Sequence, residues 1–293
     1  MRKPRHGQSG IAHLGLIAIV LIAMIAAMVW FAFHKKTSPA EPTNTQPSAS
    51  TTKSSPPPDS PSTLASPSKV TAADGKTYFY YGAPAGQNNA EPKRIIVDLP
   101  GHGTKAEDAY AVWQPYVKDT KYALAVMNWW DGEGERKEDY YSPADVATQM
   151  KAFLKAQSYE ANDIIILSGF SRGSANTYAV AANDREGGNG IFDAVISISG
   201  GYQSDFPLTN NQLNSSASAS LYEGVVWVLA CGGKDSNPNR DGCPAMNKTK
   251  TWLSQHGADV VGVLEDPNQG HGAFHRSSLN LPAKAFELIE ANL

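Results

Sequence analysis

Residues 166–179 read ILSGFSRGSANTYA, and this stretch decides the fold. The sequence Gly169-Phe170-Ser171-Arg172-Gly173 follows an apolar run typical of a buried strand and opens a run typical of a helix. In such a sharp strand-to-helix turn, a serine adopts a strained backbone and its Oγ projects above the sheet. Chance easily produces Gly-x-Ser-x-Gly in a chain with 25 glycines, so the position matters more than the pattern. A plain glycine-rich turn is the alternative.

The region around this turn, residues 70–293, alternates short apolar runs with amphipathic stretches. We expect strands at Thr77–Tyr81, Arg94–Leu99, Tyr122–Asn128, Asp163–Gly169, Phe192–Gly200, Val225–Ala230 and Asp259–Glu265. We expect helices at Glu107–Val117, Pro143–Ala156, Arg172–Ala182, Pro244–His256 and Pro282–Ala291. Several of the strands are apolar on both faces, as in a parallel sheet covered by helices. The pattern predicts an α/β fold with a mostly parallel sheet flanked by helices, and ligands at the carboxyl ends of its strands.

A serine hydroxyl is a poor nucleophile unless a base takes its proton, so Ser171 requires a histidine and an acid further along the chain. Asp235 follows the expected strand Val225–Ala230, and His271 follows the expected strand Asp259–Glu265. The chain order serine, acid, histidine is that of hydrolases with this type of turn. We therefore predict a catalytic triad of Ser171, Asp235 and His271.

Other residues compete for these roles. His275 comes four residues after His271 but lies beyond the glycine-flanked turn, and Asp241 lies deeper in the polar loop than Asp235. Asp266 begins an Asp-Pro turn and fits a structural role better. His102 as base would precede the nucleophile and break the usual chain order.

The domain resembles the α/β-hydrolase superfamily over essentially all of residues 70–293. The resemblance is carried by the Gly-Phe-Ser-Arg-Gly turn, the Gly-Gly-Lys-Asp sequence ending at Asp235 and the Gly-His-Gly sequence around His271. Within the superfamily, the chain is most similar to small secreted serine esterases related to polyhydroxybutyrate depolymerases and feruloyl esterases. The resemblance implies hydrolysis through an acyl-serine intermediate.

An oxyanion hole requires two backbone N–H groups that point at the developing negative charge. One donor is the N–H of Arg172, directly after the nucleophile. The other is expected after the strand Arg94–Leu99, in Pro100-Gly101-His102-Gly103. In the esterases that the chain resembles, this turn commonly reads His-Gly followed by the donating residue, which implies a backbone role for His102. Pro100 stands where those esterases carry the histidine.

Cys231 and Cys243 are the two cysteines of the chain and bracket the segment that carries Asp235. In an oxidising compartment they are expected to form a disulfide bond. Such a bond closes a ring of roughly 13 residues, worth ~3 kcal/mol in the chain-entropy model. Two unpaired thiols are the alternative.

Four aromatic residues follow the expected strand Tyr122–Asn128: Trp129, Trp130, Tyr140 and Tyr141. They are candidates for lining a substrate pocket, because aromatic rings combine apolar area with polar edges. A hydrophobic plug under a loop is the alternative. The polar segment between Tyr202 and Glu223 is a candidate for a short cap over the site.

Three segments precede the domain. Residues 1–10 are short and basic, and Ile11–Phe33 is an apolar run of about 23 residues, long enough to span a bilayer as a helix. Residues 37–68 consist largely of Pro, Ser, Thr and Ala and are expected to form a disordered linker. We predict a single-pass anchor with a cytoplasmic amino terminus and an extracytoplasmic domain. The alternative is a signal peptide that is cleaved on secretion.

The composition excludes a nucleic-acid binder that depends on a basic field, because 25 Lys+Arg stand against 28 Asp+Glu. The predicted chemistry requires no cofactor, and no metal site is expected, since the histidines are scattered and no Cys-x-x-Cys pair occurs. The sequence thus predicts a membrane-anchored serine hydrolase that acts on small-molecule or polymer-borne esters. The alternatives are a serine peptidase of the same fold and an inactive binding module at the cell surface. The sequence leaves the oligomeric state open.

Overall fold

The computed structural model describes residues 64–85, 91–130, 132, 139–186, 188, 190–202, 213 and 218–293. The chain divides into two compact units, Met1–Pro57 and Pro58–Leu293, and the described residues all lie in the second. The predicted basic segment, the predicted anchor and most of the predicted linker lie outside the described residues. In the part of the chain that the structure describes, no helix is long and apolar enough to cross a membrane.

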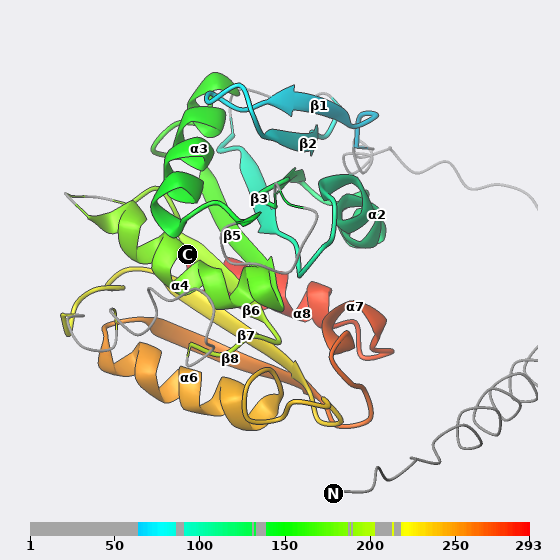
Figure 1. Ribbon diagram of the computed structural model, residues 1–293, viewed down its shortest axis with the longest axis vertical. Helices are drawn as coiled ribbons and strands as arrows, with labels where there is room; N and C mark the ends of the chain where they lie inside the picture. The colour runs from blue at the N-terminus through cyan, green and yellow to red at the C-terminus, as the bar shows by residue number, and fades with distance from the viewer. Residues whose placement is uncertain are drawn as a thin grey trace, which may run out of the picture. The chain divides into compact units, whose positions relative to one another are not determined.

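The described residues form one sheet with the strand order β1-β2-β4-β3-β5-β6-β7-β8 (Figure 1). The strands are β1 (Ser68–Thr71), β2 (Tyr78–Gly82), β3 (Arg94–Leu99), β4 (Tyr122–Met127), β5 (Ile164–Phe170), β6 (Ala194–Ile198), β7 (Val226–Gly232) and β8 (Asp259–Asp266). Strands β3 to β8 pair in parallel, whereas β1 and β2 are antiparallel to their neighbours. The predicted α/β class with a mostly parallel sheet is therefore confirmed.

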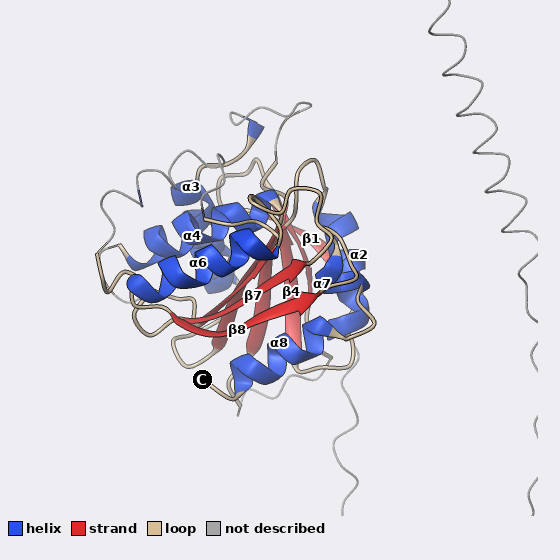
Figure 2. Ribbon diagram, turned by 90° about the horizontal axis from the view of Figure 1, so that it is seen from below, coloured by secondary structure: helices blue, strands red, loops and turns tan. Residues whose placement is uncertain are grey.

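Helices cover both faces of this sheet. They are α2 (Ala106–Val117), α3 (Pro143–Ala156), α4 (Arg172–Arg185), α6 (Cys243–Gln255), α7 (Ala273–Arg276) and α8 (Leu281–Glu290). Figure 2 shows α3, α4 and α6 on one face and α2, α7 and α8 on the other. In β3, Ile95 and Val97 belong to the apolar cluster under the first group, and Ile96 belongs to the cluster under the second. Because successive side chains of a strand point to opposite faces, burial on both faces requires the continuous apolar runs seen in the sequence.

Each predicted strand and helix forms, with bounds that shift by at most three residues. Two further elements, β1 and α7, carry no clear sequence signal. Strand β1 lies at the edge of the sheet with largely exposed side chains, so apolar patterning does not mark it. Helix α7 has four residues, too few to display a helical period.

The folded domain begins earlier than the predicted boundary at residue 70. Leu64 forms a β-bridge with Pro84, and the N–H of Ala65 donates to the carbonyl of Ala83 over 2.8 Å. Ser68 already belongs to β1 and pairs with Tyr81. The end of the predicted linker is therefore part of the sheet, because backbone pairing with β2 supplies the hydrogen bonds that a polar segment otherwise makes with water.

Candidate active site

Ser171 lies at the turn between β5 and α4 and has φ 54° and ψ −113°. Few non-glycine residues adopt a positive φ, and such strained backbone commonly marks functional sites. Two hydrogen bonds hold the turn. The N–H of Ser171 donates to the carbonyl of Ile198 in β6 over 2.8 Å, and its carbonyl accepts from the N–H of Ala175 over 3.0 Å. The neighbouring strand and the first turn of α4 therefore maintain the strained conformation.

Close backbone packing explains the glycines around Ser171. A Cβ atom at Gly169 would lie 2.6 Å from the carbonyl carbon of Gly173, and one at Gly173 would lie 1.9 Å from the carbonyl oxygen of Leu99. A Cβ atom at Gly200 would lie 2.3 Å from the carbonyl oxygen of Ser171. Larger side chains at these positions would push α4 away from β3 and β6. The glycines thus allow the turn to pack directly against the ends of its neighbouring strands.

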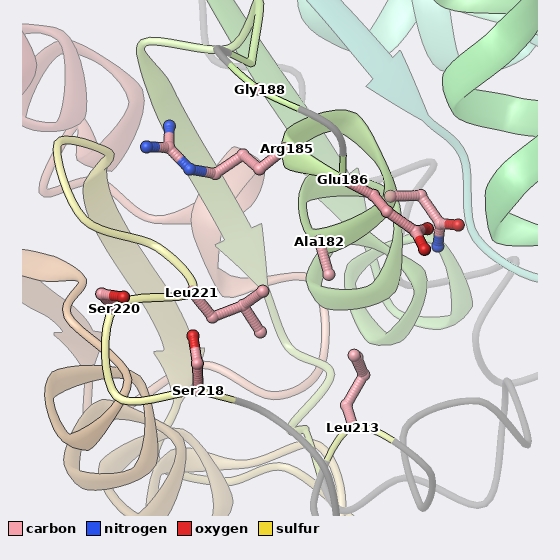
Figure 3. A pocket seen from close by; sticks show the side chains of 9 residues that line it. Ala182, Arg185, Glu186, Gly188, Leu213, Ser218, Ser220 and Leu221 are labelled. Atoms are coloured by element: carbon pink, nitrogen blue, oxygen red, sulfur yellow. The ribbon is translucent and has the colours of Figure 1, made fainter.

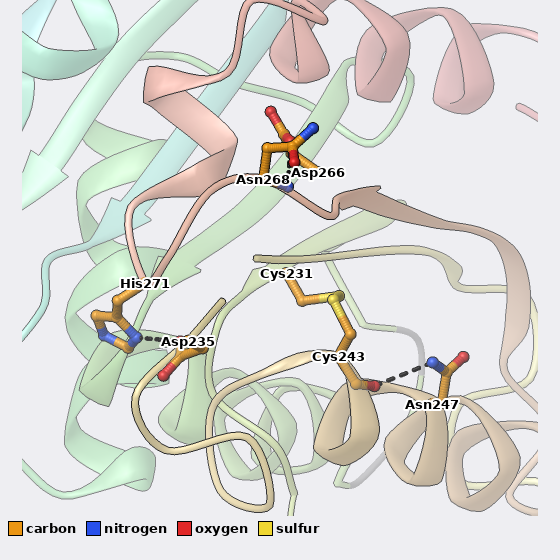
Figure 4. The surroundings of a disulfide bond; sticks show 7 residues. All are labelled: Cys231, Asp235, Cys243, Asn247, Asp266, Asn268 and His271. Atoms are coloured by element: carbon orange, nitrogen blue, oxygen red, sulfur yellow. Dashed lines mark hydrogen bonds and ion pairs between the residues drawn. A yellow bond between two sulfur atoms is a disulfide. The ribbon is translucent and has the colours of Figure 1, made fainter. Parts of the chain in front are cut away.

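His271 and Asp235 meet at the carboxyl ends of β8 and β7. The Nδ1 atom of His271 lies 2.7 Å from Oδ2 of Asp235, within hydrogen-bonding distance (Figure 4). The Asp235 side chain is fully buried, and its Oδ1 accepts the N–H of Asn237 over 2.8 Å. The His271 side chain remains 36% exposed. Because Asp235 is buried and His271 is partly exposed, the carboxylate can orient the His271 imidazole toward a reacting group at the surface.

His271 also lies beside the strained turn. Its ring centroid is 5.0 Å from that of Phe170, the residue before Ser171. The structure thus brings the three predicted triad residues to the same edge of the sheet, from loops that follow β5, β7 and β8.

The loops that carry Asp235 and His271 pack directly against each other. The N–H of Gly233 donates to the carbonyl of Asp266, and the N–H of Lys234 donates to the carbonyl of Gln269, both over 2.9 Å. A Cβ atom at Gly232 would lie 2.0 Å from the carbonyl oxygen of Gly270. These backbone contacts set the position of the acid relative to the histidine.

A disulfide bond between Cys231 and Cys243 closes the acid loop (Figure 4). Cys231 lies in β7 and Cys243 at the start of α6, so the bond joins the two elements on either side of Asp235. Within the loop, the carbonyl of Asn237 accepts the N–H groups of Arg240, Asp241 and Gly242. The loop is therefore held both by a covalent bond and by its own backbone.

The rival residues have other hydrogen-bond partners, although a carboxylate oxygen of Asp241 lies within 4.8 Å of Asp235 and His271. Asp241 accepts two hydrogen bonds from the guanidinium of Arg240, the shorter over 2.7 Å. Asp266 accepts from the hydroxyl of Ser277 over 2.6 Å, as expected for a structural residue. His275 is half-buried in α7 on the α2 face, 4.8 Å from the ring of Trp113, and desolvation with the nearby Arg276 charge lowers its pKa to about 3. A histidine in this environment stays neutral and has no contact with the acid loop among the hydrogen bonds of the described residues.

The loop after β3, expected to supply an oxyanion donor, lies next to the serine. A Cβ atom at Gly101 would lie 3.4 Å from the Cβ of Ser171. The Nδ1 atom of His102 lies 2.8 Å from the hydroxyl of Tyr140, which also accepts the N–H of Gly103 over 3.1 Å. The Nε1–H group of Trp129 donates to the carbonyl of Pro100 over 3.0 Å. Two aromatic side chains therefore hold this loop.

These contacts change the interpretation of the aromatic cluster. Trp129 and Tyr140 are 1% and 7% exposed, so they form the wall behind the loop after β3 rather than an open pocket surface. Trp130 and Tyr141 are half-buried, and the hydroxyl of Tyr141 donates to Asp74 over 2.8 Å. Sequence reasoning missed the loop-holding role because it depends on hydrogen bonds across 29 to 38 residues of chain.

The predicted cap between Tyr202 and Glu223 lies largely outside the described residues.

One further titratable group is buried near the site. Asp98 lies in β3, two residues before Pro100, and its Oδ1 has no hydrogen-bond partner among the described residues. Burial raises the pKa of Asp98 to about 6. The side chain points to the α2 face, because its neighbours Val97 and Leu99 belong to the opposite cluster.

Two groups of side chains in the described residues have the spacing of metal ligands. In the first, Cys231, Cys243 and Glu265, both sulfur atoms already form the disulfide bond. In the second, Asp235, Asp241 and His271, the carboxylates already accept hydrogen bonds from Asn237 and Arg240, and Asp235 pairs with His271. The hydrogen bonds within the second group favour acid–histidine pairing over metal binding.

A pocket of about 520 Å³ lies at the far end of α4 from Ser171 (Figure 3). Its lining includes Ala182 and Arg185 from the carboxyl-terminal part of α4, Glu186 directly after the helix, and Ser218 and Leu221. Eleven or more residues of helix separate the pocket from Ser171. At a rise of 1.5 Å per residue, this corresponds to at least ~16 Å along the helix axis. This hollow is therefore distinct from the candidate active site.

Comparison with solved structures identifies the fold. The Thermus thermophilus protein TT1662 is 16% identical, with a TM-score of 0.58, over 78% of this chain and 97% of that protein. An esterase from Pyrobaculum calidifontis is 13% identical, with a TM-score of 0.57, over 78% of this chain and 86% of the esterase. The acylaminoacyl peptidase of Pyrococcus horikoshii is 17% identical, with a TM-score of 0.55, over 79% of this chain and 42% of the peptidase. The described domain has the α/β-hydrolase fold, as the sequence resemblance implied.

No family model matches the chain, and no curated protein matches it in sequence. At such low identities, the structural likeness establishes the fold alone. The activity must be argued from the residues of the site.

Proposed function

We propose that this protein is a membrane-anchored, extracytoplasmic serine hydrolase that cleaves carboxylic esters through an acyl-serine intermediate. The observation that carries the proposal is the hydrogen bond between His271 and the buried Asp235, beside a serine in a strained strand-to-helix turn. An activated serine needs both a base and a group that orients the base. A domain that only binds ligands has no need for this costly arrangement.

The mechanism follows from the hydrogen bonds. Asp235 accepts from Nδ1 of His271, which leaves Nε2 to take the proton of Ser171 as its Oγ attacks the ester carbonyl. His271 then donates this proton to the leaving alcohol, and the acyl group remains on Ser171. In the second half-reaction, His271 takes a proton from water, which attacks the acyl-serine. His271 then returns this proton to Oγ of Ser171 as the bond to the acyl group breaks and the acid leaves. Asp235 stabilises the imidazolium that forms in each half-reaction.

The developing negative charge on the carbonyl oxygen requires hydrogen-bond donors in place before the reaction. We assign these to the backbone N–H groups of Arg172 and His102. Arg172 is the first residue of α4, where N–H groups have no acceptor within the helix and the helix dipole favours negative charge. The proximity of Gly101 to Ser171 supports a donor from the second loop.

Two classes of substrate, carboxylic esters and peptides, are candidates for this site. Similarity to an esterase over 86% of its length supports ester hydrolysis. Similarity to an acylaminoacyl peptidase makes peptide hydrolysis the second candidate, although this chain spans 42% of that protein. Parallel assays with p-nitrophenyl esters and with p-nitroanilides of acylated amino acids distinguish the two, because an esterase turns over the anilides far more slowly.

The location of the protein is supported by two features. Residues 11–33 form an apolar run of the length that a bilayer requires, and the Cys231–Cys243 disulfide bond is typical of oxidising compartments. The full chain is expected in the membrane fraction after carbonate extraction, with its domain accessible to protease added outside intact cells. Recovery of a shortened chain in the medium would instead support signal cleavage and secretion.

A fluorophosphonate probe tests the activated serine directly. The full chain in detergent should label, whereas Ser171→Ala and His271→Ala should not. His256→Ala is a matched control, because His256 lies at the end of α6 and its Nδ1 contacts the carbonyl of Trp252. If the folded, unmutated protein neither labels nor hydrolyses any ester or anilide, the proposed activity is wrong and the binding-module alternative takes its place.

A further inference from the structure

Tyr140 lies where the loop after β3 meets the nucleophile turn. It pairs with Trp130 in an isolated β-bridge after β4, and its side chain is 7% exposed. Its hydroxyl bonds to Nδ1 of His102 over 2.8 Å and accepts the N–H of Gly103 over 3.1 Å. One phenolic oxygen therefore contacts two successive residues of the loop after β3.

The ring of the same tyrosine contacts the other side of the site. The guanidinium carbon of Arg172 lies 4.9 Å from the centroid of the Tyr140 ring, within the range of a cation–π interaction. Arg172 directly follows Ser171. Tyr140 therefore contacts both His102 and Arg172, the two residues to which the proposed function assigns the oxyanion donors.

A second aromatic residue supports Tyr140 from behind. The rings of Trp129 and Tyr140 lie 4.6 Å apart, and the Nε1–H of Trp129 donates to the carbonyl of Pro100. Trp129 is 1% exposed, so Tyr140 packs against a side chain that is itself immobilised. Dense packing of this kind leaves the Tyr140 hydroxyl little freedom to move.

We propose that Tyr140 is a positioning residue that sets the spacing between the two oxyanion donors, an inference that rests on the proposed function. The donors come from segments separated by 70 positions of sequence, so their spacing depends on the tertiary contacts between the loop after β3 and the turn after β5. Electrostatic stabilisation of an oxyanion requires donors within about 2.7–3.1 Å of the charge. A rigid side chain that contacts both segments meets this requirement.

Removing the hydroxyl alone provides the test. Tyr140→Phe keeps the ring beneath Arg172 and the packing against Trp129 but loses both bonds to the loop. Because small displacements of catalytic groups cost up to about a hundredfold in rate, we expect kcat/KM for p-nitrophenyl acetate to fall about tenfold. His102→Ala removes one of the two bonds and should produce a smaller fall.

Tyr222→Phe is the matched control. Tyr222 is also a buried tyrosine, and its hydroxyl donates to the carbonyl of Tyr178 over 2.9 Å, but it lies outside the loops of the site. Its kcat/KM should equal that of the unmutated protein. Tyr140→Phe loses two hydrogen bonds and Tyr222→Phe loses one, and thermal unfolding of both variants measures how much each loss destabilises the fold.

Two further measurements separate positioning from a general structural effect. An arylboronic acid forms a tetrahedral adduct with the serine and places a negatively charged oxygen in the oxyanion site. Its inhibition constant should rise by the same factor as kcat/KM falls in Tyr140→Phe. The pH profile of kcat/KM reports the base of the free enzyme and should remain unchanged, because His271 is untouched.

The outcomes are distinct. The proposed role of Tyr140 is wrong if kcat/KM is equal in Tyr140→Phe and Tyr222→Phe, or if kcat/KM falls in Tyr140→Phe without weaker boronate binding. Either result leaves the proposed serine hydrolase activity unaffected. A shifted pH profile overturns it too, since Tyr140 would then act through the base. Absence of turnover and of labelling in the unmutated protein overturns the proposed function and this inference together.

Discussion

Relief of backbone strain at Ser171 should stabilise the fold while it abolishes activity. Ser171 has φ 54° and ψ −113°, a conformation that costs a non-glycine residue ~1–3 kcal/mol. Glycine adopts positive φ without this cost but loses about 0.4–1 kcal/mol more than alanine in conformational entropy on folding. Both Ser171→Gly and Ser171→Ala lack the hydroxyl. The difference between their free energies of unfolding is the strain minus the extra entropic cost of glycine, so the glycine variant should be about 1 kcal/mol more stable.

Urea unfolding of the unit Pro58–Leu293, followed by circular dichroism, measures this difference. Thr148 in α3 is the control site, because it is exposed and lies in the middle of a helix. There, the glycine variant should be about 1 kcal/mol less stable than the alanine variant. The sign of the glycine–alanine difference should therefore reverse between the two sites. If Ser171→Gly is no more stable than Ser171→Ala, the strain in the turn does not exceed the entropic cost of glycine, and the argument from its backbone is refuted.

Asp235→Asn should lower kcat by roughly 10⁴-fold through the wrong histidine tautomer, whereas Asp241→Asn should cost less than about tenfold in the same ester assay. Replacing Cys231 and Cys243 by serine should lower the free energy of unfolding by ~3 kcal/mol, measured by urea titration against the oxidised protein; an unchanged midpoint would contradict this. Burial raises the pKa of Asp98 from 3.8 to about 6, so the folded state holds this proton to higher pH than the unfolded chain and loses stability as pH rises through that range. The free energy of unfolding of Asp98→Asn, measured relative to that of the unmutated protein, should therefore rise by about 2–3 kcal/mol between pH 4 and pH 8. A difference between the two proteins that does not change with pH would exclude Asp98 as the cause.

Much of the fold is readable in the sequence because the sheet is buried on both faces. Runs such as Arg94–Leu99 and Ile164–Phe170 are mostly apolar on both faces, which makes them visible without any knowledge of their neighbours. The edge strand Ser68–Thr71 escapes prediction for the complementary reason. Its contribution is backbone pairing with β2, and backbone pairing leaves no mark on the type of side chain.

The identity of the nucleophile is similarly local. Gly169 and Gly173 are needed because their neighbours approach within the space of a Cβ atom, so the strained turn has its own sequence signature. The chain order of Ser171, Asp235 and His271 adds a second constraint that the sequence supplies alone. From these local features the sequence determined the α/β class, the position of the serine and the segments that carry its partners.

The choice between rivals required tertiary structure. Asp235 and Asp241 are close in sequence, yet Asp235 bonds to His271 and Asp241 to Arg240. That difference arises from how the loops after β7 and β8 pack together.

The role of Tyr140 is of the same kind, since its hydroxyl reaches a loop 37 to 38 residues away. Local sequence encodes which residues favour a strand, a helix or a turn. The partners of each polar side chain depend on which distant segments the folded chain brings together, and only the tertiary structure decides them.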